Sequence, residues 1–271
     1  MQSPLNTNDS IGQNNFYQMA DYAQSSNEAS CLDILEIRIF QVMIGFQTPN
    51  VFKVFAANDQ GDQIEQKELF KYKEKSSTCA RLTLSPNFRP FEMFVSNYGC
   101  KDFQPNSDQL FQENSDRIIW KYDRKYTCTC FCLNRLRLDV QYVENGQNKN
   151  LGYIVNPFYC CRLGCHIYDF EDKLKYIIEA SICQCYFWCR CPCGDQCNHV
   201  EFDIKSPNGE VVAPMKKKVR GCCQNWADFV DNISVVFPQN ASKEDKALIL
   251  AAAIMFKYMY FENKDGPQPS N

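Results

Sequence analysis

The sequence is poor in histidine and carries no excess of positive charge. Only two of its 271 residues are histidines, His166 and His199, and its 29 Lys and Arg face 32 Asp and Glu, which gives a formal net charge of −3. It contains no glycine-rich phosphate loop, no G-x-S-x-G nucleophile motif and no H-E-x-x-H zinc motif. Nucleic-acid binding requires a net basic surface. We therefore expect no nucleic-acid partner and no catalytic reaction.

The first 30 residues contain no Lys or Arg, and no apolar run in them exceeds two residues. A secretory signal needs both features. Fourteen of these residues are Asn, Gln or Ser, which is typical of disordered segments. We predict a polar tail over 1–30, one folded domain over 31–265 and a short tail over 266–271. We also expect a reducing compartment in which most cysteines remain thiols.

Apolar residues alternate with polar ones along much of the domain, which predicts β-strands. Leu136–Tyr142 is the clearest case and is followed by a hairpin turn containing Gly146, and Val200–Lys205 repeats the pattern. Ten or more such strands favour a barrel or a sandwich. A further strand is predicted at Arg81–Leu84, whereas 60–76 and 101–116 are predicted to be solvated loops.

One segment near the C-terminus breaks the strand pattern. Ser242 and Asp245 form a capping-box sequence, and Ala247–Phe261 is apolar on every face of a helix. Fifteen helical residues span roughly 22 Å, short of the ~30 Å hydrocarbon core of a bilayer. We therefore favour a helix over 243–262 enclosed by a β-barrel, rather than a membrane span. Its expected buried side chains include Leu248, Ile249, Ala252, Met255 and Phe256.

The chain contains 17 cysteines, and none of them forms a C-x₂-C pair of the kind found in structural zinc sites. The usual spacing is C-x-C, which on a strand places thiols on one face. Three interpretations remain open. The thiols could be small buried apolar groups. They could be acceptors for palmitate. Alternatively, His199 could bind zinc together with four cysteines, namely Cys189, Cys191, Cys193 and Cys197.

Only one strongly basic run occurs, and it comprises Lys216, Lys217, Lys218 and Arg220. Such a run is often a solvated loop. It would also attract anionic lipids, at ~1 kcal/mol for each basic residue near the membrane surface, or act as a nuclear-import signal.

The chain resembles the phospholipid scramblase family over about residues 31–265. The resemblance rests on motifs in a fixed order rather than on one decisive signature. In chain order these are Gly45–Asn50, Arg89–Met93, Cys189–Asp195, Val200–Ser206, Trp226, Asp231-Asn232, Phe237-Pro238 and the closing helix at Lys246–Glu262.

This resemblance implies a mainly β fold: a closed, antiparallel, tubby-like barrel of about twelve strands around the C-terminal helix. It also implies Ca²⁺-stimulated, ATP-independent movement of phospholipids between leaflets at the cytoplasmic face of the plasma membrane. The palmitoylated cysteine run of the family falls on Cys128, Cys130 and Cys132. The import stretch of the family falls near Met215–Arg220, which allows for a cytosolic or nuclear pool.

The calcium-binding stretch of the family falls on residues 229–240. Asp231, Asn232 and Asn240 offer side-chain oxygens there, but Phe229 and Ser234 stand in place of an acid and a glycine. We therefore expect weak Ca²⁺ binding. Because the Pro-rich tail common in relatives is absent from residues 1–30, no readers of Pro-rich motifs are expected as partners.

Two functions from different classes follow. The first is a lipid-anchored scramblase whose partner is the phospholipid membrane. The alternative is a membrane-associated module that binds anionic lipids and recruits other proteins without transporting lipid. A zinc-binding protein is a minor third interpretation.

Overall fold

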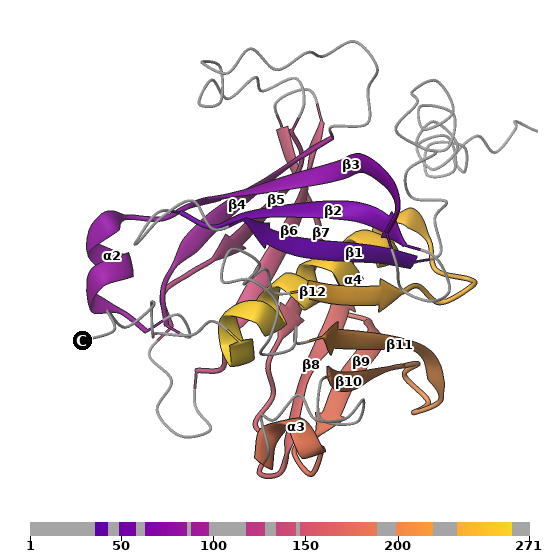
Figure 1. Ribbon diagram of the computed structural model, residues 1–271. Coiled ribbons are helices and arrows are strands. Elements are labelled where there is room, and N and C mark those ends of the chain that lie inside the picture. The colour runs from indigo at the N-terminus through magenta and orange to yellow at the C-terminus, as the bar shows by residue number, and fades with distance from the viewer. Residues whose placement is uncertain are drawn as a thin grey trace, which may run out of the picture.

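The computed structural model describes residues 36–42, 49–57, 63–85, 88–97, 118–127, 134–144, 147–188, 199–218 and 232–261. Twelve strands and a C-terminal helix dominate these segments (Figure 1). The strands are β1 (Glu36–Val42), β2 (Val51–Ala57), β3 (Gln63–Lys75), β4 (Phe91–Asn97), β5 (Ile118–Arg124), β6 (Arg137–Glu144), β7 (Gln147–Val155), β8 (Arg162–Asp169), β9 (Leu174–Ser181), β10 (His199–Lys205), β11 (Val211–Lys218) and β12 (Asn232–Val236). The helices are α2 (Thr78–Thr83), α3 (Cys185–Trp188), α4 (Lys243–Phe256) and the π-helical turn η6 (Lys257–Phe261).

Each strand pairs antiparallel with its neighbours in the sequence, and β1 pairs with both β2 and β12. The strand order therefore runs once around a closed barrel. Short hairpins join many of the strands, as expected for an antiparallel meander. In Figure 1 the yellow ribbon of α4 passes behind β1 and β12, inside the ring of strands.

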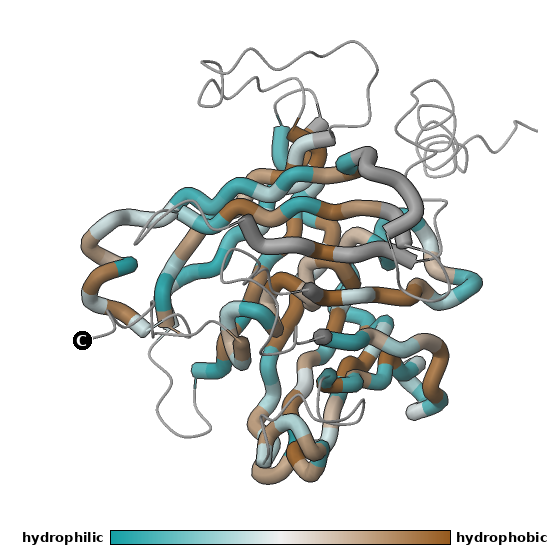
Figure 2. Tube along the Cα trace, in the orientation of Figure 1, coloured by the Kyte–Doolittle hydropathy of each residue, from teal (hydrophilic) through white to brown (hydrophobic). Residues whose placement is uncertain are grey.

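The barrel interior is filled by α4. All residues from Asp245 to Phe256 are buried, so the helix is enclosed on every side. The close approach of the strands is clearest at Gly152 on β7, where an added Cβ would lie 2.3 Å from the Tyr168 carbonyl oxygen and 3.2 Å from Leu248 Cδ2. Inward side chains of the strands complete the core, which produces the alternating brown and teal of Figure 2. The five side chains predicted to be buried on the helix are all within this core.

Local sequence determines where α4 begins. The Ser242 hydroxyl accepts a hydrogen bond from the Asp245 amide at 3.1 Å, and the Asp245 carboxylate accepts one from the Ser242 amide at 3.2 Å. This reciprocal pair is the capping box that the sequence predicts. The helical segment then ends in the π-helical turn η6 rather than continuing as an α-helix to residue 262.

Both the mainly antiparallel β architecture and the enclosed C-terminal helix are confirmed. Two local predictions are wrong. The segment 60–76, predicted as a loop, contains the whole of β3, because cross-strand pairing with β2 and β4 outweighs its charged, strand-poor composition. The strand predicted at Arg81–Leu84 lies largely in α2, since Ser77 caps a helix by accepting from the Ala80 amide.

Among the described residues, none of the helices is both long and apolar enough to span a bilayer.

Candidate functional site

The predicted palmitoylation cysteines, Cys128, Cys130 and Cys132, lie outside the described residues. So do the four cysteines predicted to bind zinc with His199. No group of three or more potential metal ligands occurs within the part of the chain that the structure describes. Six cysteines are described: Cys79, Cys160, Cys161, Cys165 and Cys183 are free thiols, and Cys185 is disulfide-bonded.

Two of the three predicted calcium ligands, Asn232 and Asn240, lie within the described residues. Asp231 lies outside them. Asn232 is the first residue of β12, where its backbone is paired with Phe40 on β1 and with Lys218 on β11. Asn240 is exposed in the turn that follows β12. Asn232–Val236 is an extended strand, and Ca²⁺ binding by the stretch 229–240 stays a prediction.

Three residues of the basic run, Lys216, Lys217 and Lys218, lie in strand β11 and not in a loop. Lys216 points outward and pairs with Glu201 at 2.8 Å. Lys217 points inward and is only 3% exposed, with its Nζ 4.1 Å from the ring centroid of Phe261. A basic patch containing Lys217 is therefore a wrong prediction, because strand alternation turns every second side chain into the barrel. The side chain of Lys218 and the whole of Arg220 lie outside the described residues.

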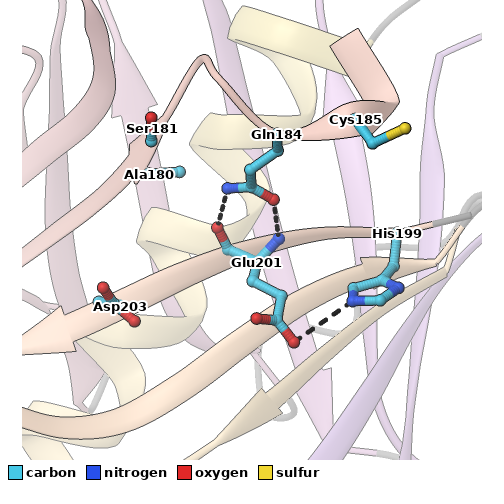
Figure 3. A pocket seen from close by; sticks show the side chains of 7 residues that line it. All are labelled: Ala180, Ser181, Gln184, Cys185, His199, Glu201 and Asp203. Atoms are coloured by element: carbon cyan, nitrogen blue, oxygen red, sulfur yellow. Dashed lines mark hydrogen bonds and ion pairs between the residues drawn. The ribbon is translucent and has the colours of Figure 1, made fainter. Parts of the chain in front are cut away.

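An open pocket lies where β9 and β10 separate (Figure 3). The two strands pair only through Asp203, Ile204 and Lys205. Beyond this point the Gln184 side chain takes the place of a strand: its Nε2 donates to the Glu201 carbonyl at 2.7 Å, and its Oε1 accepts from the Glu201 amide at 2.8 Å. The pocket is lined by Ala180, Ser181, Gln184, Cys185, His199, Glu201 and Asp203.

The charges at this pocket are largely compensated. A hydrogen bond from Lys216 is the main reason that the pKa of Glu201 lies below its ordinary value. His199 Nε2 lies 3.3 Å from the same carboxylate. The other histidine, His166, is on β8, where burial lowers its pKa and Tyr159 Oη lies 2.8 Å from its Nε2.

A buried polar network holds the C-terminal end of the helical segment to the barrel. The Glu74 carboxylate on β3 is fully buried and accepts hydrogen bonds from Tyr258 Oη at 2.7 Å and from the Asn50 amide at 3.0 Å. Arg89 Nε lies 3.5 Å from Glu74, and the Phe91 ring stacks on Tyr258 with centroids 4.4 Å apart.

Sequence reasoning missed Glu74 and Tyr258 as partners. Asn50, Arg89 and Phe91 all belong to segments on which the family resemblance rests, so the structure gives two of these motifs a shared role. They join β2, β3 and β4 to the end of the enclosed helix.

Tyr260, also in η6, forms a second set of hydrogen bonds between the helical segment and the barrel. Tyr260 Oη accepts hydrogen bonds from Asn156 Nδ2 at 3.1 Å and from the Gly164 amide at 3.3 Å. Burial raises the pKa of Tyr260 to about 12, so the phenol remains neutral at physiological pH. Arg135 Nε in turn donates to the Asn156 carbonyl at 2.9 Å.

An exposed group of thiols and aromatic rings lies at the start of β8 and the end of β9. We call it the thiol corner and define it as Phe158, Cys160, Cys161, Cys183 and Trp188. Phe158 is 59% exposed and Trp188 is 77% exposed. The three cysteines are exposed free thiols. The pKa of Cys161 is raised, chiefly by a hydrogen bond with the neighbouring Cys160.

The family comparison and the most similar curated proteins agree with each other. Residues 33–263 match the Scramblase family. Phospholipid scramblase 2 of Bos taurus is 24% identical over 234 residues, which cover 85% of this chain and 68% of the relative. Phospholipid scramblase 1 of Homo sapiens is 23% identical, with 84% of this chain and 61% of the relative covered, and that of Rattus norvegicus is 20% identical, with 84% and 58% covered. The chain therefore spans about three fifths of the length of several of these relatives. No solved structure matches.

Proposed function

Because this chain belongs to the scramblase family, we propose that it moves phospholipids between the two leaflets of a membrane, in both directions and without ATP. The family match over residues 33–263 carries this proposal, since it includes all twelve strands and the enclosed helix. The absence of a phosphate-binding loop in the sequence agrees with independence from ATP. We also propose that the barrel is of the tubby-like class, as the resemblance implies.

The packing of the barrel restricts where lipids could move. A polar headgroup that crosses hydrocarbon needs polar partners along its path. The barrel interior is filled by α4, whose residues from Ala247 to Phe256 are buried and apolar. We therefore propose that the protein acts on lipids from its outer surface, while attached to the cytoplasmic face of the plasma membrane.

Attachment and regulation are the finer parts of this proposal. Palmitate on Cys128, Cys130 and Cys132 would supply lipid anchors, and two or more acyl chains are what stable anchoring requires. Lys216 would add attraction to anionic lipids, with Lys218 and Arg220 as further candidates. Ca²⁺ stimulation would use Asp231, Asn232 and Asn240, and zinc remains a separate minor proposal at His199.

Reconstitution into liposomes tests the activity. Purified protein is added to vesicles that contain a fluorescent phospholipid, and dithionite then bleaches the label in the outer leaflet. Scrambling makes the inner-leaflet label accessible, so the bleached fraction exceeds that of empty vesicles. The same assay with Ca²⁺ and with a chelator tests stimulation. Bleaching that stays at the level of empty vesicles under both conditions would overturn the transport proposal.

The alternative is a membrane-associated lipid-binding module that does not transport lipid. The filled barrel interior favours it, because no polar path through the described residues is apparent from their burial. Binding to vesicles without accelerated bleaching would support this alternative. Replacement of Lys216 by Gln should then weaken binding to anionic vesicles more than binding to neutral ones.

A further inference from the structure

The thiol corner is located by the pairing of β8 with β9. Arg162 and Ser181 form the last pair of this hairpin at its open end. Cys160 and Cys161 immediately precede Arg162, and Cys183 follows Ser181 by two residues. The start of β8 and the end of β9 therefore lie at the same end of the hairpin, and the chain continues from β9 toward α3 (Figure 1).

The aromatic ring of Trp188 is held outward by a specific contact. Its indole Nε1 donates a hydrogen bond to the Ile182 carbonyl at 3.1 Å, while 77% of the residue is exposed. A large apolar ring is therefore presented to solvent with its only polar group already satisfied. Burying this ring against a partner would cost no hydrogen bond.

Phe158, which precedes the start of β8, is a second exposed ring and lies beside a cation. The guanidinium carbon of Arg135 lies 5.9 Å from the Phe158 ring centroid. Arg162 at the start of β8 is also largely exposed, although it pairs with Glu179 at 3.2 Å. Exposed aromatic rings at one end of a hairpin, one of them beside a guanidinium group, match the boundary of a phospholipid bilayer, where rings lie at headgroup level and arginine can reach phosphate.

The opposite end of the same hairpin has the reverse charge. The turn between β8 and β9 also exposes a phenylalanine, Phe170, which is 58% exposed. Around it lie Asp169, Glu171 and Asp172, which an anionic membrane would repel. The two ends of one hairpin thus display equally exposed phenylalanines in opposite electrostatic surroundings.

We propose that the thiol corner is a membrane-docking surface whose partner is the phospholipid bilayer, with Trp188 and Phe158 entering the headgroup region. This proposal rests on the proposed function only in assuming that the protein works at a membrane.

Vesicle flotation with matched variants tests this surface. The full-length chain, its F158A/W188A variant and its F170A variant are mixed with vesicles of phosphatidylcholine and phosphatidylserine. The double variant should bind roughly tenfold more weakly or worse, since burial of a large apolar side chain is worth at least that factor. F170A should bind like the wild type. Circular dichroism melting of each variant verifies that the fold is intact.

Fluorescence quenching locates the ring directly. Phospholipids with brominated acyl chains should quench the tryptophan emission of the wild type and quench that of W188F much less. The proposal is overturned if the wild type and W188F are quenched equally, or if F170A loses as much vesicle binding as F158A/W188A. It is also overturned if size-exclusion chromatography shows that F158A/W188A abolishes self-association rather than membrane binding.

The outcomes separate docking from transport. Protein that binds through Trp188 but does not accelerate bleaching would retain the docking surface and remove the scramblase activity. Conversely, transport by a double variant that still floats with vesicles would remove the docking surface and retain the activity.

Discussion

Tyr258 and Trp188 lie in two aromatic regions of the molecule that differ in what surrounds them. Tyr258 is 1% exposed, stacks on Phe91 and donates to a fully buried carboxylate. Trp188 is 77% exposed, and its single hydrogen bond is made to the local backbone. The region around Tyr258 joins the enclosed helix to three strands. Trp188, in contrast, bonds only to Ile182, six residues earlier in the chain. This difference indicates that folding free energy is concentrated around the helix, while the thiol corner is available to a partner.

The sharpest test of this contrast is truncation inside the barrel. Phe256 is 1% exposed and lies 4.7 Å, centroid to centroid, from Phe202. Phe256→Ala should lower the free energy of unfolding by about 3–5 kcal/mol, because it leaves a cavity that the barrel cannot collapse to fill. Urea unfolding monitored by circular dichroism measures this loss. Trp188→Ala is the control and should change the same quantity by less than about 0.5 kcal/mol. Equal losses would contradict the division between the two regions.

Removing one buried charge should have the next largest effect. In Glu74→Gln the buried Arg89 loses its carboxylate partner, and we expect a loss of about 3 kcal/mol in the free energy of unfolding. Glu92→Gln is the matched control, because the Glu92 carboxylate pairs with Lys121 at 2.6 Å on the partly exposed face of the same sheet. Its loss should stay below about 1 kcal/mol. A control that costs as much as Glu74→Gln would show that burial is not the cause.

The smallest effect is expected from acid titration of the barrel surface. The pKa of Glu201 is lowered in the folded protein, chiefly by the hydrogen bond from Lys216. Its contribution to stability is therefore present above the ordinary carboxyl pKa and is lost as the pH falls through the lowered value. In Lys216→Met the decrease of stability on acidification should be shallower than in the wild type, by less than about 1 kcal/mol because both partners are partly exposed.

Unfolding midpoints measured from pH 7 down to about pH 3 test this expectation, a window set by the ordinary carboxyl pKa. Lys175→Met is a comparison variant. Lys175 lies on another strand, β9, and its Nζ pairs with the Asp245 carboxylate of α4 at 3.5 Å. An acid response in Lys216→Met that is identical to the wild type would mean that the pair contributes nothing measurable.

Strand alternation alone predicts the direction of each side chain in the basic run. Ala213, Met215 and Lys217 occupy every second position of β11, so the same period that identifies the strand also predicts that Lys217 points inward. Reading the basic run as one charged surface ignored this period. The partners of Glu74 could not be found in this way, because Tyr258 is 184 residues away in the sequence.

By itself, the sequence determined the local elements with strong patterns. The capping box at Ser242, the uniformly apolar segment that follows it and the alternation in strands such as β6 each depend on neighbouring residues, and each predicted its element correctly. The tertiary structure alone decided the rest. Cross-strand pairing made β3 from a charged segment, and closure of the barrel brought Asn50, Glu74 and Tyr258 together. Local periodicity specifies which face of a strand is buried, but only the register and order of strands around the helix specify which distant side chains meet.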